Sequence, residues 1–335
     1  MTLVQRVFTA LSDGTVHSGE QLAAAQAVSR SAIWKAVSAL EALGVPIEAI
    51  PHRGYRLPQP VTPLDAAHIV AKLAPEVRSK LGLGESAWSL VSTNDALLAR
   101  AEQKDPRVLP ASGQFDFLVA EYQTAGRGRR SRPWLAPPGG ALCLSLGWSF
   151  ATLPKGAAAL SLAMGVCALR AMRALGVSAV QLKWPNDLLA YDRKLGGILI
   201  ELRAESAGPA YVVIGMGINC ALGTSLTQQV QETGTEPIDL QALGMASCDR
   251  NRLAAALIDE LVRGVLEFER TGLASFAPEW NAADALVGRV VQVGATTGAF
   301  VGHARGIDAD GALCVQGLTG TQRFNSGEVT VRSQA

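Results

Sequence analysis

The chain has 335 residues, of which 48% are hydrophobic and 18% charged, and its formal net charge is +1. This composition excludes a disordered chain, and the length predicts two or three domains because single hydrophobic cores stop growing beyond roughly 250–300 residues. A near-neutral charge provides no general attraction to nucleic acid, so any DNA binding has to come from a local patch.

The sequence also argues against several locations and site types. The longest apolar stretch, residues 156–169, is shorter than the roughly 20 residues that span a bilayer, and the N-terminus lacks the pattern of a signal peptide. Five scattered cysteines contain no Cys-x-x-Cys pair, which argues against disulfides and a zinc site. We therefore expect a cytoplasmic protein without a membrane segment and without a dedicated metal site.

Three short helices are predicted at the start of the chain. Apolar residues recur at helical spacing from Leu3 to Leu11, ahead of Asp13-Gly14. Ser18 opens a second helix, where Gln21 can complete a capping box. Ser29 opens a third, with an apolar stripe that ends before Gly44.

Two short strands, 45–50 and 55–57, follow the third helix, and the whole pattern predicts a winged helix-turn-helix over residues 1–60. A small protein-docking domain with the same pattern remains the alternative. Five basic against four acidic side chains predict weak DNA binding by one copy, so a dimer would be needed. The residues expected to face DNA are Arg30, Ser31, Trp34, Lys35, Arg53 and Arg56.

Prolines 58, 60 and 63 predict a linker with a domain boundary near residue 62. Between residues 62 and 280, strand-like runs alternate unevenly with helices, and several runs follow one another directly. This pattern favours an α/β domain with a mixed, largely antiparallel sheet. The runs are residues 117–120, 141–148, 180–184, 197–202 and 211–218.

Within this domain, four arginines lie in six residues from Arg127 to Arg132. Gly126 and Gly128 let the backbone approach a ligand closely, and guanidinium groups bind phosphate or carboxylate by two-point contacts. The segment predicts an anion clamp. On its own it is equally compatible with a solvated basic loop or an arginine-rich tether for nucleic acid.

The last fifty residues, from about residue 284, consist of strands and turns, and Asp310-Gly311 is a hairpin signal. The strand-like runs are residues 288–293, 300–306, 313–317 and 322–324. They predict a small β-domain over residues 284–335.

Three motifs follow the arginine loop in the chain: Lys183-Trp-Pro-Asn-Asp187, Arg193-Lys-Leu-Gly-Gly-Ile-Leu-Ile-Glu201 and Ile214-Gly-Met-Gly-Ile-Asn219. Together with the loop they resemble the active site of the biotin–protein ligases, and the resemblance runs from about Ser92 to the C-terminus. The winged helix-turn-helix matches the bifunctional members of that family, which also repress the biotin operon. Lipoate ligases share the fold but lack the arginine loop, and they are the nearest enzymatic alternative.

The resemblance implies a multidomain α+β protein with a winged helix-turn-helix, a class II synthetase-like catalytic domain and an SH3-like C-terminal barrel. It implies that ATP, carrying Mg²⁺, activates biotin as biotinyl-5′-AMP, which is passed to a lysine of the biotin carboxyl carrier protein of acetyl-CoA carboxylase. It also implies a homodimer that forms on ligand binding and represses biotin genes by binding their operator DNA. A ligase without repressor activity remains the alternative.

Catalysis has to bring together two anions, the biotin carboxylate and the α-phosphate, so fixed cations are needed between them. The resemblance implies that Lys194 contacts both, that Lys183 and Arg129 assist, and that Asp187 takes a proton from the acceptor lysine. The alternative for Lys194 is an exposed lysine at the start of a strand. The alternative for Asp187 is a simple ion pair with Lys183.

The remaining ligand contacts are also implied by the resemblance. The alternative to a ligand contact is a helix cap for Ser92 or Thr93 and a core anchor for Trp134. The arginine loop is expected to close over the bound ligands as a lid. The residues implied for biotin are Ser92, Thr93, Asn94, Gln123, Gly126, Arg127, Gly128, Arg129, Lys194 and Gly197. Those implied for the nucleotide are Arg129, Arg132, Trp134, Asn186, Gly217 and Asn219.

Overall fold

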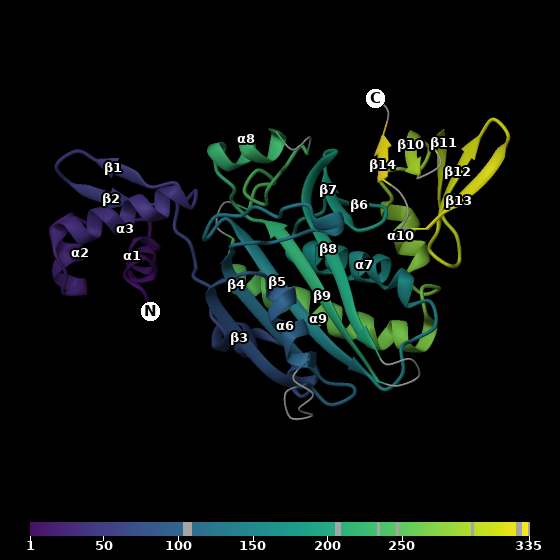
Figure 1. Cartoon of the computed structure of the whole chain (residues 1–335), viewed down its shortest axis with the longest axis horizontal. Coiled ribbons are helices and arrows are strands. Elements are labelled where there is room, and N and C mark those ends of the chain that lie inside the picture. Colours follow the sequence, from purple (N-terminus) through teal and green to yellow (C-terminus); the bar gives the residue numbers. More distant parts are fainter. Residues whose placement is uncertain are drawn as a thin grey trace.

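The structure is a computed structural model that describes residues 1–102, 109–204, 209–232, 235–245, 248–295, 298–325 and 330–333. Figure 1 shows a small N-terminal helical part, a central sheet with its helices, and a group of C-terminal strands on the far side of the molecule.

The N-terminal part forms because two serines cap its helices. Ser18 and Gln21 make both hydrogen bonds of the expected capping box, and Ser29 accepts a hydrogen bond from the Ala32 amide. Val7, Ile33 and Leu40 are among the residues of its own small core. The predicted three helices and strand pair are confirmed. Their bounds are α1 Leu3–Leu11, α2 Gly19–Gln26, α3 Arg30–Ala42, β1 Glu48–Ile50 and β2 Gly54–Arg56.

The central sheet has seven strands in the order β3-β4-β5-β9-β8-β7-β6, and all neighbours are antiparallel except the parallel pair β3–β4. The predicted mixed, largely antiparallel sheet is therefore confirmed. The strands are β3 Leu81–Leu90, β4 Phe115–Gln123, β5 Ala141–Phe150, β6 Val180–Lys183, β7 Asp187–Ala190, β8 Arg193–Ala204 and β9 Ala210–Asn219.

Helices cover both faces of this sheet. α7 Leu160–Ala174 and α9 Arg250–Thr271 pack together and share the main hydrophobic core with the sheet, while α6 Thr93–Glu102 packs on a separate cluster that includes Leu118 and Val213. Residues Ala157–Ala174 are long and apolar enough to cross a membrane, but 67% of that window is buried in the protein, as in a core helix. The shorter helices are α4 Ala66–Lys72, α5 Pro75–Arg78, α8 Thr224–Glu232 and α10 Ala277–Ala283.

The C-terminal strands form a five-stranded antiparallel sheet in the order β13-β12-β11-β10-β14. Its apolar side, including Val291 and Val315, joins the main core, so the expected small β-domain is confirmed and docks on the central domain. The strands are β10 Val290–Ala295, β11 Gly298–Ile307, β12 Leu313–Gly317, β13 Gly320–Phe324 and β14 Thr330–Ser333.

A buried ion pair anchors the segment that joins the N-terminal and central parts. The Arg250 guanidinium, 1% exposed, lies 2.8 Å from a carboxylate oxygen of Glu121 and also donates to the carbonyl oxygens of Thr62 and Ala141. Glu121 in turn accepts a hydrogen bond from the backbone amide of Leu64. The start of α9 therefore holds the linker against the central sheet.

Candidate active site

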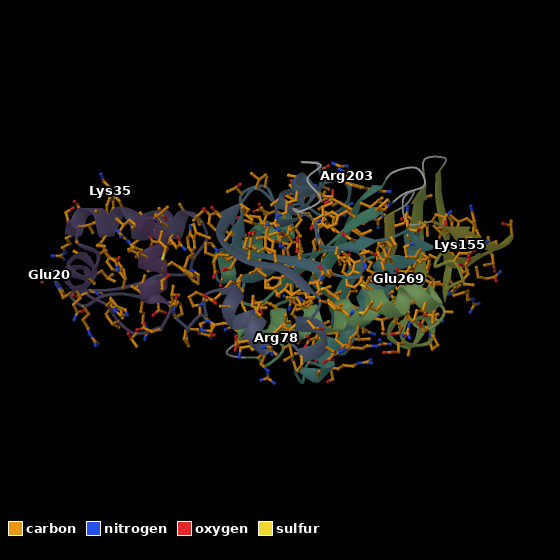
Figure 2. All side chains as sticks on the ribbon, turned by 90° about the horizontal axis from the view of Figure 1, so that it is seen from below. Glu20, Lys35, Arg78, Lys155, Arg203 and Glu269 are labelled. Carbon is orange, nitrogen blue, oxygen red and sulfur yellow. The ribbon has the colours of Figure 1, made fainter. Side chains whose placement is uncertain are left out.

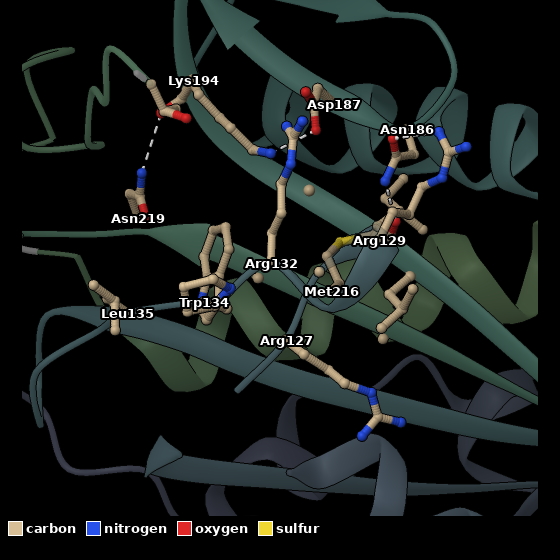
Figure 3. A pocket seen from close by; sticks show the side chains of 18 of the residues that line it. Arg127, Arg129, Arg132, Trp134, Leu135, Asn186, Asp187, Lys194, Met216 and Asn219 are labelled. Atoms are coloured by element: carbon tan, nitrogen blue, oxygen red, sulfur yellow. Dashed lines mark hydrogen bonds and ion pairs between the residues drawn. The ribbon is translucent and has the colours of Figure 1, made fainter. Parts of the chain in front are cut away.

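A pocket of about 850 Å³ opens between the arginine loop, the β6–β7 turn and the strands β8 and β9 (Figure 3). Its volume lies in the range of small-molecule sites. Every residue implied above for catalysis, biotin or the nucleotide lines it, with the exception of Gly126. Segments far apart in the sequence thus meet in one cavity.

One end of the pocket is a polar network at the start of α6. The Gln123 side-chain oxygen accepts hydrogen bonds from the Thr93 amide (2.7 Å) and hydroxyl (3.1 Å). The hydroxyl of Ser145, on β5, lies 2.7 Å from Thr93 Oγ1 and 2.6 Å from Asn94 Oδ1. The Ser92 hydroxyl also accepts a hydrogen bond from the Asp95 amide and so caps the helix, which means that Ser92 both lines the pocket and caps α6.

Ser145 is a member of this network that the sequence analysis missed. It is fully buried on a strand whose apolar neighbours predict only a core strand. An isolated serine in such a run gives no signal by itself; its role depends on β5 lying beside the Thr93–Asn94 turn.

The arginine loop folds as a tight hairpin over the pocket. The Gly128 amide donates to the Arg132 carbonyl oxygen, and the Trp134 amide donates to that of Gly126, each at 2.7 Å. A side chain at Gly126 would place its Cβ 2.8 Å from the backbone carbonyl oxygen of Trp134, so glycine is required here for packing within the loop. Gly126 therefore positions the loop and lies outside the pocket lining.

The arginines of the loop point in different directions, as Figure 3 shows. Arg127 turns away from the lysines and forms ion pairs with Asp95 and, at 2.8 Å, with Glu201, which keep its pKa above the usual value. Arg129 lies 3.4 Å from Asn186 Oδ1, and burial together with neighbouring Arg130 lowers its pKa. Arg132 points towards Asp187 and Lys194.

Two lysines and one aspartate form the opposite end of the pocket. Lys183 and Asp187 face each other across the β6–β7 turn, but the Asp187 carboxylate makes its ion pair with Lys194, at 2.7 Å from Nζ. The alternative of a simple Lys183–Asp187 pair is therefore not what the structure contains. Burial lowers the pKa of Lys183, and nearby Lys194 contributes in the same direction.

The backbone around Lys194 is fixed by the segment at Pro237. The Lys194 amide donates to the Glu236 carbonyl oxygen at 2.7 Å, and the Ile238 amide donates to that of Lys194 at 2.9 Å. Asn219 Nδ2 donates to the carbonyl oxygens of both Lys194 and Ile238. The side-chain amide of Asn219 thus fixes the backbone at Lys194.

Trp134 lies half-buried across Gly217. A Cβ on Gly217 would lie 2.5 Å from the indole ring, so only glycine allows this close contact. Cys143 lies beneath the indole, and burial raises its pKa to about 12, which keeps the thiol protonated and unreactive. Trp134 therefore closes one wall of the pocket while keeping ring surface next to the cavity.

The C-terminal domain supports the lysine end of the site. Trp184, in the turn between Lys183 and Asp187, donates its indole N–H to the Gly311 carbonyl oxygen at 3.0 Å. Arg289 pairs at 2.6 Å with Asp192 in the β7–β8 turn. Among the residues that the structure describes, no three His, Cys, Asp or Glu side chains cluster in a way that could hold a metal ion.

The pocket has a hydrogen-bonding network at one end and lysines and arginines around a carboxylate at the other, an arrangement that fits a carboxylate-activating ligase, and the family matches identify it as a protein ligase of the biotin and lipoate class. Residues 111–219 match the Biotin/lipoate A/B protein ligase family, residues 5–56 an HTH domain and residues 286–332 the Biotin protein ligase C terminal domain. The fold resembles that of the biotin protein ligase from Aquifex aeolicus in complex with biotin and ATP, with a TM-score of 0.62 and 23% identity over 76% of this chain and 99% of that chain.

The similarity extends to full-length relatives. The chain is 37% identical over 334 residues to the bifunctional ligase/repressor BirA of Escherichia coli (strain K12), covering 99% of this chain and 98% of that protein. It is 39% identical over 334 residues to BirA of Salmonella typhimurium, with the same coverage. The chain belongs to the biotin protein ligases, within the BirA-like group of bifunctional ligase/repressors.

Proposed function

We propose that the protein activates biotin with ATP as biotinyl-5′-AMP and transfers the biotin to one lysine of a biotin carboxyl carrier protein, and that it represses biotin-synthesis genes. The observation that carries the ligase activity is a single pocket that joins the Thr93–Asn94 network to the Lys183–Asp187–Lys194 cluster. The first end suits a neutral ring with both donors and acceptors, and the second suits two anions.

The ureido ring of biotin is assigned to the polar network. Asn94 is held by Ser145 and by Glu201, to which its Nδ2 donates at 2.8 Å, and Thr93 is held by Gln123. A Cβ on Gly215 would lie 2.3 Å from Asn94 Oδ1, so glycine on β9 is what lets this side chain lie flat against the strand. Such preorganised polar groups select a ligand that satisfies them all.

The carboxylate and the nucleotide are assigned to the lysine end. Arrival of the biotin carboxylate displaces Asp187 from Lys194, and a carboxylate oxygen then attacks the α-phosphorus of ATP and releases pyrophosphate. Lys183, Lys194 and Arg129 offset the negative charge that builds up during this step. Mg²⁺ enters with the ATP phosphates as part of the substrate.

Transfer of biotin to the carrier protein uses the Asp187 carboxylate, which no longer pairs with Lys194. The acceptor lysine arrives as an ammonium, which cannot attack until it loses a proton, and we assign the removal of this proton to Asp187. The neutral amine then attacks the carbonyl carbon of the adenylate, and AMP leaves. We place this reaction in the cytoplasm.

The direct test is transfer of labelled biotin to a purified carrier domain in the presence of MgATP. We expect labelled biotin to be attached to the carrier domain only when ATP is present, and we expect labelled lipoate not to be attached. Incorporation of lipoate but not biotin would assign the chain to the sister class of ligases.

Loss of one loop arginine should release the activated intermediate. We expect Arg129→Gly to biotinylate bystander proteins, because the guanidinium beside Asn186 is one of the groups that hold the adenylate and the arginine loop over the pocket. The measurement is labelling of a protein that contains no acceptor domain. Arg305→Gly, which changes an exposed arginine on β11, is the control, and equal bystander labelling by the two variants would contradict a retaining role for Arg129.

Repression is proposed from the winged helix-turn-helix and from the bifunctional relatives. One copy neutralises few phosphates, so operator binding is expected from a homodimer that forms when biotin and ATP are bound. The carrier protein, by consuming the adenylate, would then relieve repression.

Footprinting on DNA upstream of biotin-synthesis genes tests this role. We expect protection with biotin and ATP that disappears in the double variant Arg30→Ala, Lys35→Ala, because both side chains are exposed on α3 and lie off its buried stripe. The double variant should keep ligase activity, since neither residue lines the pocket. If no DNA is protected at near-physiological salt, the proposed repressor function is wrong, and the proposed ligase activity is unaffected.

A further inference from the structure

Trp34 is the one exposed tryptophan of the six in the chain, with 59% of its surface accessible, whereas the other five are buried or half-buried. It lies in the first half of α3, about 100° around the helix from Ile33 and so to one side of the buried stripe of Ile33, Val37 and Leu40. A partner that covered this indole would gain free energy, because burying an aromatic ring is favourable.

The neighbours of Trp34 on this face are small. Helical spacing places Ser31 and Ser38 three and four residues away on the same side, where they rise less far than the indole. The ring is therefore the most prominent feature of the helix surface that would enter a groove. A duplex major groove, about 12 Å wide, admits such a helix.

The charges around this face favour DNA over an apolar protein partner. Lys35 follows Trp34 and points away from the molecule in Figure 2, and no ion pair is found for Lys35 or for Arg53 of the wing within the described residues. Arg30 reaches Glu20 only at 3.7 Å and is 76% exposed. Arg30 and Lys35 lie on α3 four residues before and one residue after Trp34, where they can contact the phosphate backbone beside the groove.

The major-groove edge of DNA offers one apolar group, the C5 methyl of thymine, and every other feature there is a hydrogen-bond donor or acceptor. The indole presents mainly carbon and a single N–H donor. We propose that Trp34 is a specificity-determining residue that packs on a thymine methyl in each operator half-site. This inference rests on the operator binding proposed above and deepens it, since it names a base that the helix reads.

The test begins with selection of binding sites from a random-sequence duplex pool by the full chain with biotin and ATP. Each thymine of the selected consensus is then replaced, one at a time, by deoxyuridine, which lacks only the methyl group. We expect one such replacement per half-site to weaken wild-type binding roughly tenfold, the size of one lost base contact, and to leave the binding of Trp34→Ala unchanged. Trp34→Phe, which keeps an apolar ring, should retain part of the preference.

Lys35→Ala provides the matched control on the next residue of the helix. It should weaken binding to all duplexes alike and reduce the salt dependence by about one phosphate contact, while preserving the sensitivity to deoxyuridine. Biotin transfer should be normal in every α3 variant, because the helix does not line the pocket.

Two outcomes overturn the inference in distinguishable ways. A clear consensus whose deoxyuridine substitutions affect wild type and Trp34→Ala equally would remove the thymine contact but leave operator binding intact. Failure of the wild-type chain to select any consensus would remove both the contact and the operator binding from which it follows.

Discussion

Lys194→Ala should lower the rate of biotin-dependent pyrophosphate release by about 10²–10³-fold or more, the size expected when one donor to a developing charge is removed. In the proposed reaction Lys194 Nζ lies between the carboxylate and the phosphate, and in the structure it pairs with Asp187 at 2.7 Å. Without it, the cation that we assign to both anions is missing.

The fold should survive this change. Both side chains of the Lys194–Asp187 pair are partly exposed, so losing the pair should cost no more than about 1 kcal/mol of unfolding free energy. Urea unfolding of the variant tests this point, and Lys155→Ala, an exposed lysine outside the pocket, is the control for activity. Pyrophosphate release at the wild-type rate in Lys194→Ala would show that the catalytic role assigned to Lys194 is wrong.

Arg250→Ala should destabilise the protein by about 3–5 kcal/mol, because it leaves the carboxylate of Glu121 buried without its charge partner. Arg250 is 1% exposed and Glu121 is 4% exposed, and together they bind the backbone of Thr62, Leu64 and Ala141. The measurement is the midpoint of urea unfolding followed by the fluorescence of the buried tryptophans.

The same helix offers a matched control. Arg263 of α9 pairs with Glu76 on the surface, where water screens the charges, so Arg263→Ala should destabilise the protein far less than Arg250→Ala. Equal destabilisation by the two substitutions would mean that the buried pair contributes no more than an exposed one. Replacing Glu121 and Arg250 together by apolar residues should restore part of the loss, since no unpaired charge then remains.

Local sequence signals were sufficient to predict helices and strands whose ends are set by residues close together in the chain. Ser18 and Gln21 form a capping box from residues three apart, and strand-like apolar runs predicted β4, β5 and β9. β3 was missed because Gly82 and Gly84 interrupt its pattern; the missing side chain at Gly84 makes room for the ring of Phe117. β14 was missed because it has only four residues, and it pairs with β10, far from it in sequence.

The sequence by itself determined the domain types, the order of the motifs and about half of the residues that line the pocket, because these short motifs resemble those of a known family. Only the tertiary structure decided which of these side chains contact one another. It turned Arg127 towards Asp95 and Glu201, paired Asp187 with Lys194 instead of Lys183, and brought Ser145 against Asn94. These contacts join residues on different strands and helices, and their geometry depends on sheet register and packing, which no local pattern encodes.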